Sequence, residues 1–229
     1  MKYMNKILMG LLIMTAIVVS GIAFYNTKAK AEENLNNNWN DIPKIKMLLK
    51  NGKKSYSVSI ADVEKYHNGG DGVCLGLASG FRACQIAFSA IYPDGTPKLG
   101  DLCVISGTFR TCPADAITYI TGVRYGKGSE GAFNGNYIFD KSIGQFNFVF
   151  INTSNGKAVK LVSKYKTPNE FDELQKKSKT NPELKNKFTQ LSDSLARKIL
   201  TAPSNEIFEV SPLPEFKWKE YKEKYLKDK

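Results

Sequence analysis

Apolar and polar residues divide this chain into three parts. Residues 7–25 are almost wholly apolar, residues 57–162 hold several apolar runs separated by turn residues, and the chain beyond Tyr165 is rich in Lys, Glu, Asn and Ser. The middle part predicts buried helices and strands, whereas the last part predicts amphipathic helices. Because the two element types are mixed without strict alternation, we expect an α+β fold, with a mixed or antiparallel sheet packed with helices and a helical C-terminal extension.

The strongest helix is predicted over residues 75–91. This segment lacks proline, is apolar nearly all round, and is followed by the turn sequence Tyr-Pro-Asp-Gly. Small residues recur on it at helical spacing, so that another backbone can approach closely, either in the same chain or across a dimer. These residues are Gly76, Gly80, Ala83 and Ala87.

Shorter elements are expected on both sides of this helix. Pro113 favours a helix that begins at Cys112. Alternating or continuous apolar runs predict strands, and apolar residues at helical spacing predict the C-terminal helices. The strands are expected over 101–106, 136–140, 145–151, 158–162 and 206–210, and the helices over 112–121, 169–178 and 182–200. We interpret residues 32–56 as a polar linker, 57–212 as a single core domain, and 213–229 as a charged C-terminal helix.

The apolar N-terminal run resembles an export signal. Lys2 and Lys6 precede it, and Ala29 and Ala31 offer small residues at the two positions that a signal peptidase recognises. The run also approaches the ~20 residues that span a bilayer, so an uncleaved membrane anchor over residues 7–25 is the alternative to a signal peptide over 1–31. In both cases we expect the folded part to be extracellular or in the cell envelope.

Charge adds one exclusion. The chain carries 33 basic and 22 acidic residues, for a formal net charge of +11. Such an excess suits solubility and attraction to an anionic envelope. We do not expect nucleic-acid binding, because the lysines form no basic stripe interleaved with aromatic residues.

The four cysteines leave several states open. An even number of cysteines in an exported chain suggests disulfides, and three pairings are possible. The absence of a Cys-x-x-Cys pair excludes a zinc ribbon. Cys84 falls within the buried helix and Cys103 within a buried strand, so we expect both to pack as small apolar residues.

The remaining two cysteines and the only histidine carry the candidate chemistry. His67 lies seven residues before Cys74, and both Cys74 and Cys112 open a predicted helix. The positive end of a helix dipole favours a thiolate there. Thiolates and neutral imidazole bind transition metals, zinc above all. The same thiols could instead perform redox chemistry, or all three residues could be chemically inert.

Three further residues have weaker claims. Asp115 lies three residues after Cys112, on the same side of the short helix, where it could accept a hydrogen bond from a metal ligand or respond to the helix dipole. Arg82, in an apolar helix, needs a carboxylate or carbonyl partner, and Asp115 is a candidate. Lys127, between two glycines, could bind an anion, although the full phosphate-loop pattern is absent.

The order of these motifs resembles the family of the E-type subunit of formylmethanofuran dehydrogenase. The motifs are Cys-Leu-Gly-Leu-Ala-Ser-Gly-Phe-Arg-Ala from residue 74, Cys-Pro-Ala-Asp-Ala-Ile from 112, Thr-Gly at 121 and Tyr-Gly-Lys-Gly from 125, and the similarity covers about residues 62–212. The resemblance implies an α+β core that forms homodimers and a metal site, usually taken as zinc. Carried over, that site falls on His67, Cys74 and Cys112, with Asp115 nearby.

The chain also departs from the family pattern. The family has histidines four and two residues before its first cysteine, whereas here the closer position is Gly72 and His67 lies further back. We therefore do not infer formylmethanofuran dehydrogenase activity. Three hypotheses remain, with any enzymatic reaction left open: an exported metal-binding protein with room for a small ligand, a thiol–disulfide redox protein using Cys74 and Cys112, and a non-catalytic binding module of the envelope.

Overall fold

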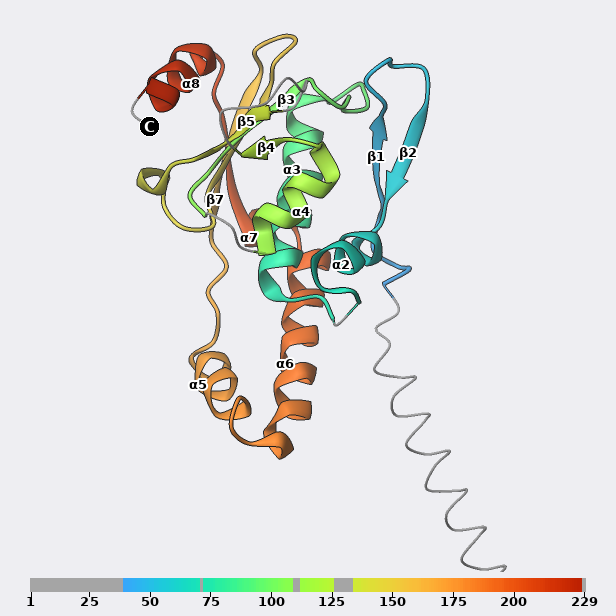
Figure 1. The fold of residues 1–229 in the computed structure, drawn as a ribbon, viewed down its shortest axis with the longest axis vertical. Helices are drawn as coiled ribbons and strands as arrows, with labels where there is room; N and C mark the ends of the chain where they lie inside the picture. Colours follow the sequence, from blue (N-terminus) through green and yellow to red (C-terminus); the bar gives the residue numbers. More distant parts are fainter. Residues whose placement is uncertain (1–38, 71, 109–111, 126–133, 228–229) are drawn as a thin grey trace, which may run out of the picture. The chain divides into compact units, whose positions relative to one another are not determined.

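A six-stranded mixed sheet and a two-stranded sheet organise the protein (Figure 1). The computed structural model describes residues 39–70, 72–108, 112–125 and 134–227. The large sheet has the order β4-β5-β3-β6-β7-β8. Its strands are β4 (Arg124–Tyr125), β5 (Asn134–Phe139), β3 (Leu102–Ser106), β6 (Phe148–Asn152), β7 (Ala158–Ser163) and β8 (Phe208–Pro212). Helices pack against this sheet, so the predicted α+β fold is confirmed.

The central strand β3 separates two apolar layers. It pairs in parallel with β5 and antiparallel with β6, and all five of its residues are buried. Side chains alternate between the faces of a strand. Leu102 and Val104 therefore join the core that contains α3 (Leu75–Ile91), whereas Cys103 and Ile105 join a smaller cluster on the other face. Figure 1 shows α3 and α8 (Trp218–Lys227) on opposite sides of the sheet.

Helices α3 and α4 (Cys112–Thr121) have the predicted bounds. The small-residue face of α3 packs against α4 of the same chain. A Cβ added at Gly80 would lie 2.6 Å from the carbonyl oxygen of Pro113, and one at Gly76 would lie 3.0 Å from the Cβ of Cys112. Because α4 covers these two glycines, the interpretation of this face as a dimer contact is wrong for this part of the helix.

The segment interpreted as a linker belongs, in its described part, to the core. Residues 39–56 include strand β1 (Ile45–Leu48), which pairs with β2 (Ser55–Val58), and Trp39 and Met47 are buried. Helix α2 (Ile60–Asn68) follows, and Ser59 and Asp62 form a capping box at its start. The predicted signal segment, 1–31, lies outside the described residues.

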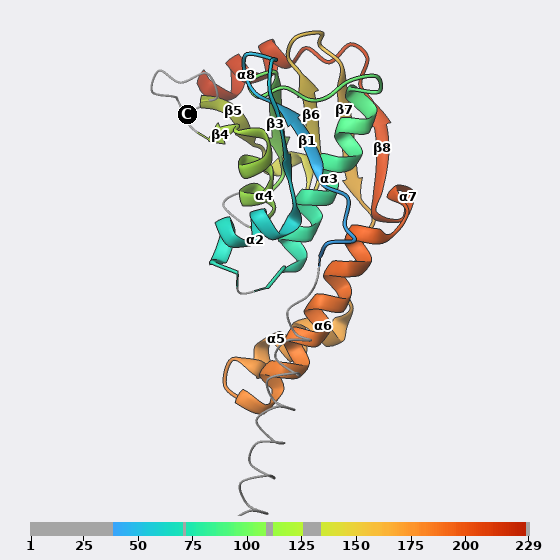
Figure 2. The same cartoon turned by 90° about the vertical axis from the view of Figure 1, so that its right-hand side faces the viewer.

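The C-terminal third closes the fold at two places. Helices α5 (Asn169–Ser178) and α6 (Pro182–Thr201) form a hairpin, and the C-terminal part of α6 reaches the core beside α3 (Figure 2). A single helical turn, α7 (Ser204–Ile207), delays β8 by two residues relative to the prediction. Helix α8 covers the second face of the sheet. Over the described ranges, no helix combines the length and apolarity that a membrane span requires.

Candidate metal centre

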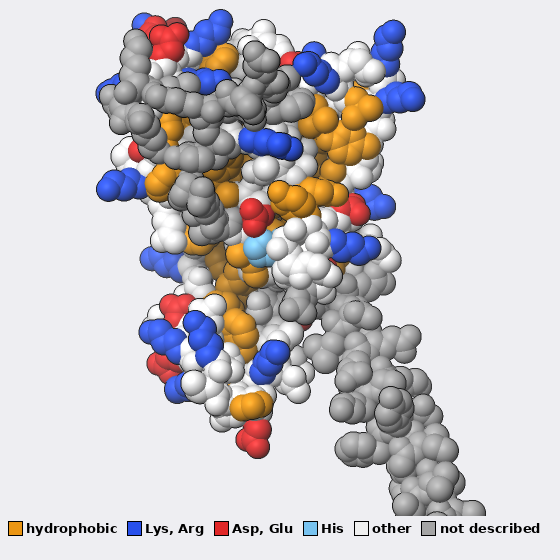
Figure 3. All heavy atoms as spheres, viewed as in Figure 1, with side chains coloured by type: hydrophobic (Ala, Val, Ile, Leu, Met, Phe, Trp, Pro, Cys, Tyr) orange, Lys and Arg blue, Asp and Glu red, His pale blue; other side chains and the backbone are white. Residues whose placement is uncertain are grey.

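The structure brings together the imidazole and two thiols that the sequence singles out. One potential ligand atom from each of His67, Cys74 and Cys112 lies within 4.8 Å of the others. The three residues come from three elements: the last turn of α2, the N-cap of α3 and the first residue of α4. All three are partly exposed, and Figure 3 shows the histidine at the surface beside an acidic side chain.

Glycines at the end of α2 turn the chain back toward the thiols. Gly69 ends the helix with φ = 77°, and Gly70 and Gly72 have φ of 102° and 103°. L-residues rarely adopt this left-handed region, so glycine fits it best. The backbone N–H of Gly72 donates to Glu64 Oε1 at 2.8 Å, which ties the loop to α2. His67 is thus a helical residue held above the start of α3, and not the solvated loop residue of the inert alternative.

Close packing of α3 on α4 places the two cysteines side by side. Cys74 caps α3, and its Sγ accepts a hydrogen bond from the N–H of Leu77 at 3.4 Å. Two residues on, Gly76 lies against the Cβ of Cys112. A side chain at Gly76 would force the helix starts apart. The glycine therefore sets the separation of the two sulfurs.

Asp115 positions the imidazole. Its Oδ2 lies 2.7 Å from Nδ1 of His67, and the two side chains are 45% and 20% exposed. The ionised carboxylate accepts a hydrogen bond, which favours the tautomer with the proton on Nδ1. That tautomer leaves the lone pair of Nε2 free. Asp115 thus stands directly behind the histidine, as a carboxylate behind a metal-binding imidazole does.

The two thiols share a proton unequally. The hydrogen bond from Cys112 lowers the pKa of Cys74 to about 7, helped by the backbone N–H groups of Leu77 and Gly76 and opposed by burial. The same hydrogen bond, together with burial, raises the pKa of Cys112. The pair therefore loses its first proton near neutral pH and holds the second firmly. One thiolate is available in the metal-free protein.

The other two cysteines take no part in this cluster. Cys84 is buried within α3, and Cys103 belongs to the apolar cluster on the other face of the sheet. Burial raises the pKa of both thiols, to about 12 for Cys103. All four cysteines are free thiols, so none of the three expected disulfide pairings is formed.

Arg82 and Lys127 do not join the site as expected. Arg82 donates through Nη1 to Gln85 Oε1 at 2.9 Å and through Nη2 to the carbonyl of Ala202 at 2.8 Å. The expected pairing of Arg82 with Asp115 is therefore wrong, because Asp115 binds His67 and the partners of Arg82 are neutral. Lys127 lies outside the described residues.

An aromatic pair next to the site escaped the sequence analysis. The rings of Tyr66 and Tyr119 lie 5.0 Å apart, and both are exposed. Tyr66 precedes His67, and Tyr119 lies one turn beyond Asp115 on α4. The spacing from Asp115 to Tyr119 puts the two side chains on one face of a helix. That spacing was the one available signal, and it acquires meaning only when α2 lies beside α4.

Comparisons with known proteins identify the family. No curated protein matches the chain. A solved structure described as a tungsten formylmethanofuran dehydrogenase FmdE-like protein, from Syntrophus aciditrophicus, is 18% identical, with a TM-score of 0.41, and the match covers 72% of this chain and 76% of that one. The sequence profile described as "FmdE, Molybdenum formylmethanofuran dehydrogenase operon" matches residues 71–209, which include Cys74, Cys112 and Asp115 but begin after His67. Since this match extends over more than half of the sequence, the chain belongs to the FmdE family.

Proposed function

We propose that the protein binds a transition metal ion, with zinc as the first choice, through His67, Cys74 and Cys112. The observation that carries this proposal is the approach of the three ligand atoms to within 4.8 Å of one another. They come from stretches far apart in the sequence, and no disulfide or buried salt bridge explains why they meet. Nitrogen and thiolate sulfur are the ligands that zinc prefers.

The donor set fits such an ion. Ideal zinc bond lengths place tetrahedral ligand atoms about 3.5–3.8 Å apart, so the side chains need to close in by about 1 Å. Asp115 occupies Nδ1 of His67 and leaves Nε2 as the ligand. Three protein ligands leave a fourth position for water or a small molecule. The partial exposure of all three side chains keeps that position accessible.

The residues divide the chemistry of the site among them. Cys74 supplies a thiolate near neutral pH, whereas Cys112 must release its proton when metal binds. His67 and Asp115 supply a neutral ligand of fixed tautomer. A bound zinc ion would act as a Lewis acid toward whatever occupies the fourth position. We do not propose formylmethanofuran dehydrogenase activity.

The proposal extends to location and assembly. Supported by the N-terminal apolar run with its flanking lysines and small residues, we place the domain outside the cytoplasm, released or anchored by residues 7–25. The resemblance to the family supports a homodimer. Fractionation of cells that express the full chain, followed by light scattering of the purified protein, tests both statements. A cytoplasmic or monomeric protein would contradict the corresponding statement.

Metal analysis of the purified full chain tests the site. We expect about one metal ion per chain, and at least a tenfold weaker affinity in Cys74→Ser, Cys112→Ser and His67→Gln. Cys103→Ala is the matched control, because it removes a cysteine on the opposite face of the sheet. Unchanged metal content in both serine variants would refute the proposal. Circular dichroism of each variant separates ligand loss from unfolding.

The hydrogen bond between Cys74 and Cys112 favours a second function, thiol–disulfide exchange. The Cys74 thiolate would attack a disulfide of a partner, releasing one partner thiolate and forming a mixed disulfide. Cys112, as thiolate, would then displace the second partner sulfur and leave a Cys74–Cys112 disulfide. Mass-spectrometric thiol counting on the native protein decides. Two oxidised cysteines without metal would favour exchange, and four thiols with bound metal would favour the metal centre.

A further inference from the structure

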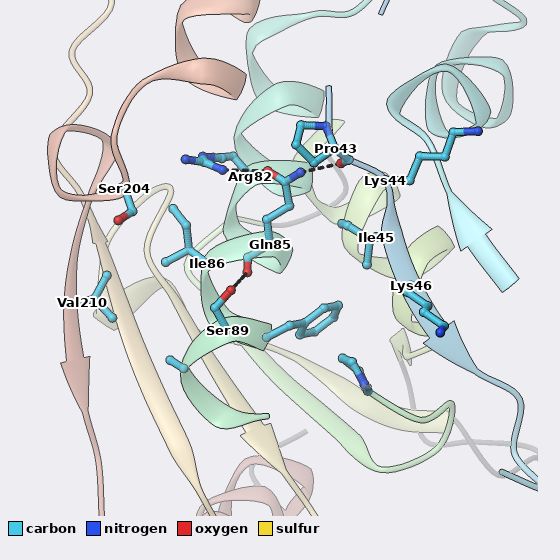
Figure 4. A pocket seen from close by; sticks show the side chains of 13 residues that line it. Pro43, Lys44, Ile45, Lys46, Arg82, Gln85, Ile86, Ser89, Ser204 and Val210 are labelled. Atoms are coloured by element: carbon cyan, nitrogen blue, oxygen red, sulfur yellow. Dashed lines mark hydrogen bonds between the residues drawn. The ribbon is translucent and has the colours of Figure 1, made fainter. Parts of the chain in front are cut away.

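A groove of about 690 Å³ lies on a different side of α3 from the metal centre (Figure 4). Strand β1 forms one wall, β8 and the preceding turn form the other, and α3 forms the floor. The volume is typical of a small-molecule site. Gly76 and Gly80 face α4, whereas Arg82, Gln85 and Ser89 repeat at helical spacing along the floor. The groove is therefore separate from the cysteines.

The charge lining this groove has one sign. Lys44, Lys46 and Arg82 contribute to its walls and floor, and no acidic residue does. Lys44 extends away from the floor (Figure 4) and acts electrostatically on Asp62 of α2. Among the residues that the structure describes, neither Lys46 nor Arg82 forms an ion pair. The groove thus has an uncompensated positive charge.

Arg82 is fixed in place without a counter-charge. Its two hydrogen bonds go to the amide of Gln85 and the carbonyl of Ala202, and its Nε is buried without a partner. Burial lowers the pKa of this guanidinium. A partly buried cation bonded only to neutral groups is costly. A guanidinium has five N–H donors, so its two remaining Nη–H groups are free to bind an anion.

Apolar side chains flank the cation. Ile86 lines the floor, and Val210 on β8 is 37% exposed, which makes it one of only four large hydrophobic residues exposed in the described part of the chain. A bare inorganic anion would leave both side chains in contact with water. An anion that carries an apolar portion would cover them. The combination therefore selects against small inorganic ions.

We infer that this groove binds a small organic anion, whose acid group pairs with Arg82 and whose apolar portion lies on Ile86 and Val210. The inference is independent of the metal, because the groove shares no residue with the cluster of His67, Cys74 and Cys112.

Calorimetry on the full chain with octanoate tests this inference, with octanol, octylammonium and inorganic phosphate as comparison probes. We expect octanoate to bind at least tenfold more tightly than each of the other three. Tight binding of octanol would show that charge plays no part. Phosphate binding as strong as octanoate would remove the apolar half of the inference. No octanoate binding would overturn it altogether.

Variants locate the binding. Arg82→Gln removes the cation and should weaken octanoate at least tenfold. Arg82 also holds the carbonyl of Ala202, so this variant could unfold. Val210→Glu, at an exposed position, places a repelling charge in the groove and should weaken octanoate by a similar factor without that risk. Lys50→Gln, at an exposed lysine outside the groove, is the matched control. Octanoate affinity unchanged by Val210→Glu, or lowered equally by Lys50→Gln, would overturn the inference.

Discussion

Replacing Gly80 by alanine separates two physical effects of opposite sign. In an exposed helix the change stabilises, because alanine has the higher helix propensity, by about 1 kcal/mol. Here the new Cβ would lie 2.6 Å from the carbonyl oxygen of Pro113, 2.8 Å from its Cα and 3.0 Å from the Cβ of Ala116. The first two contacts are with backbone atoms, which cannot rotate away. Helices α3 and α4 must therefore move apart.

The sizes of the two effects predict the sign. Overpacking a core costs typically about 1–3 kcal/mol, and the backbone contacts place Gly80→Ala at the upper end. Subtracting the gain in propensity leaves a net loss of about 2 kcal/mol in the free energy of unfolding. The same movement draws Cys112 away from Cys74. We expect the affinity for zinc to fall about tenfold, which corresponds to ~1.4 kcal/mol.

Urea unfolding of the metal-free full chain measures the first effect, and competition with a zinc-binding dye measures the second. Gly95→Ala is the matched control, since a Cβ there meets no atom within 4 Å. It should change the free energy of unfolding by less than about 0.5 kcal/mol. A Gly80→Ala variant that is more stable than the wild type would refute the close packing of α3 on α4. A destabilised variant with unaltered zinc affinity would refute the link between this packing and the site.

Three further predictions concern other parts of the molecule. Asp115→Asn should weaken metal binding about 10–100-fold, because it disturbs the imidazole tautomer, while the free energy of unfolding changes little at this 45% exposed position; unchanged affinity by dye competition would contradict the role of the carboxylate. In the metal-free protein the iodoacetamide alkylation rate of Cys74 should have a midpoint near pH 7, and Cys112→Ala should raise it by removing the hydrogen-bond donor. Because the folded pKa of this thiol is lowered, its contribution to stability is complete only above the unfolded thiol pKa of about 8.5 and is lost as pH falls through about 7. Met47→Ala should cost about 2–5 kcal/mol in urea unfolding, because the side chain is fully buried, whereas a linker residue would cost almost nothing.

The elements that the sequence predicts well are those with strong local signals. Helix α3 is a long apolar run stopped by a turn sequence, and α4 has proline at its second position. Strands β6 and β7 are apolar segments joined through a turn at Asn155-Gly156. Each of these signals lies within the element or directly beside it. Tertiary contacts then only have to agree with the local preference.

The elements that were missed depend on distant contacts. Strand β1 has four residues with alternating burial, too few for a clear pattern, and it follows an Asn-rich stretch. An isolated hairpin is marginally stable in water. The pair β1–β2 therefore forms because residues such as Met47 pack into the core. The single turn of α7 is likewise too short to have a stability of its own.

The chemistry of the site was predictable from the sequence, but its assembly was not. The family profile begins at residue 71 and so supplies Cys74, Cys112 and Asp115 without the histidine. In this chain His67 comes from the end of α2, and its contact with Asp115 replaces the missing local spacing. Two separate contacts thus build the cluster: Gly76 against Cys112 joins the thiols, and Asp115 against His67 adds the imidazole. Because both contacts end on α4, this short helix is the common support of all three ligands.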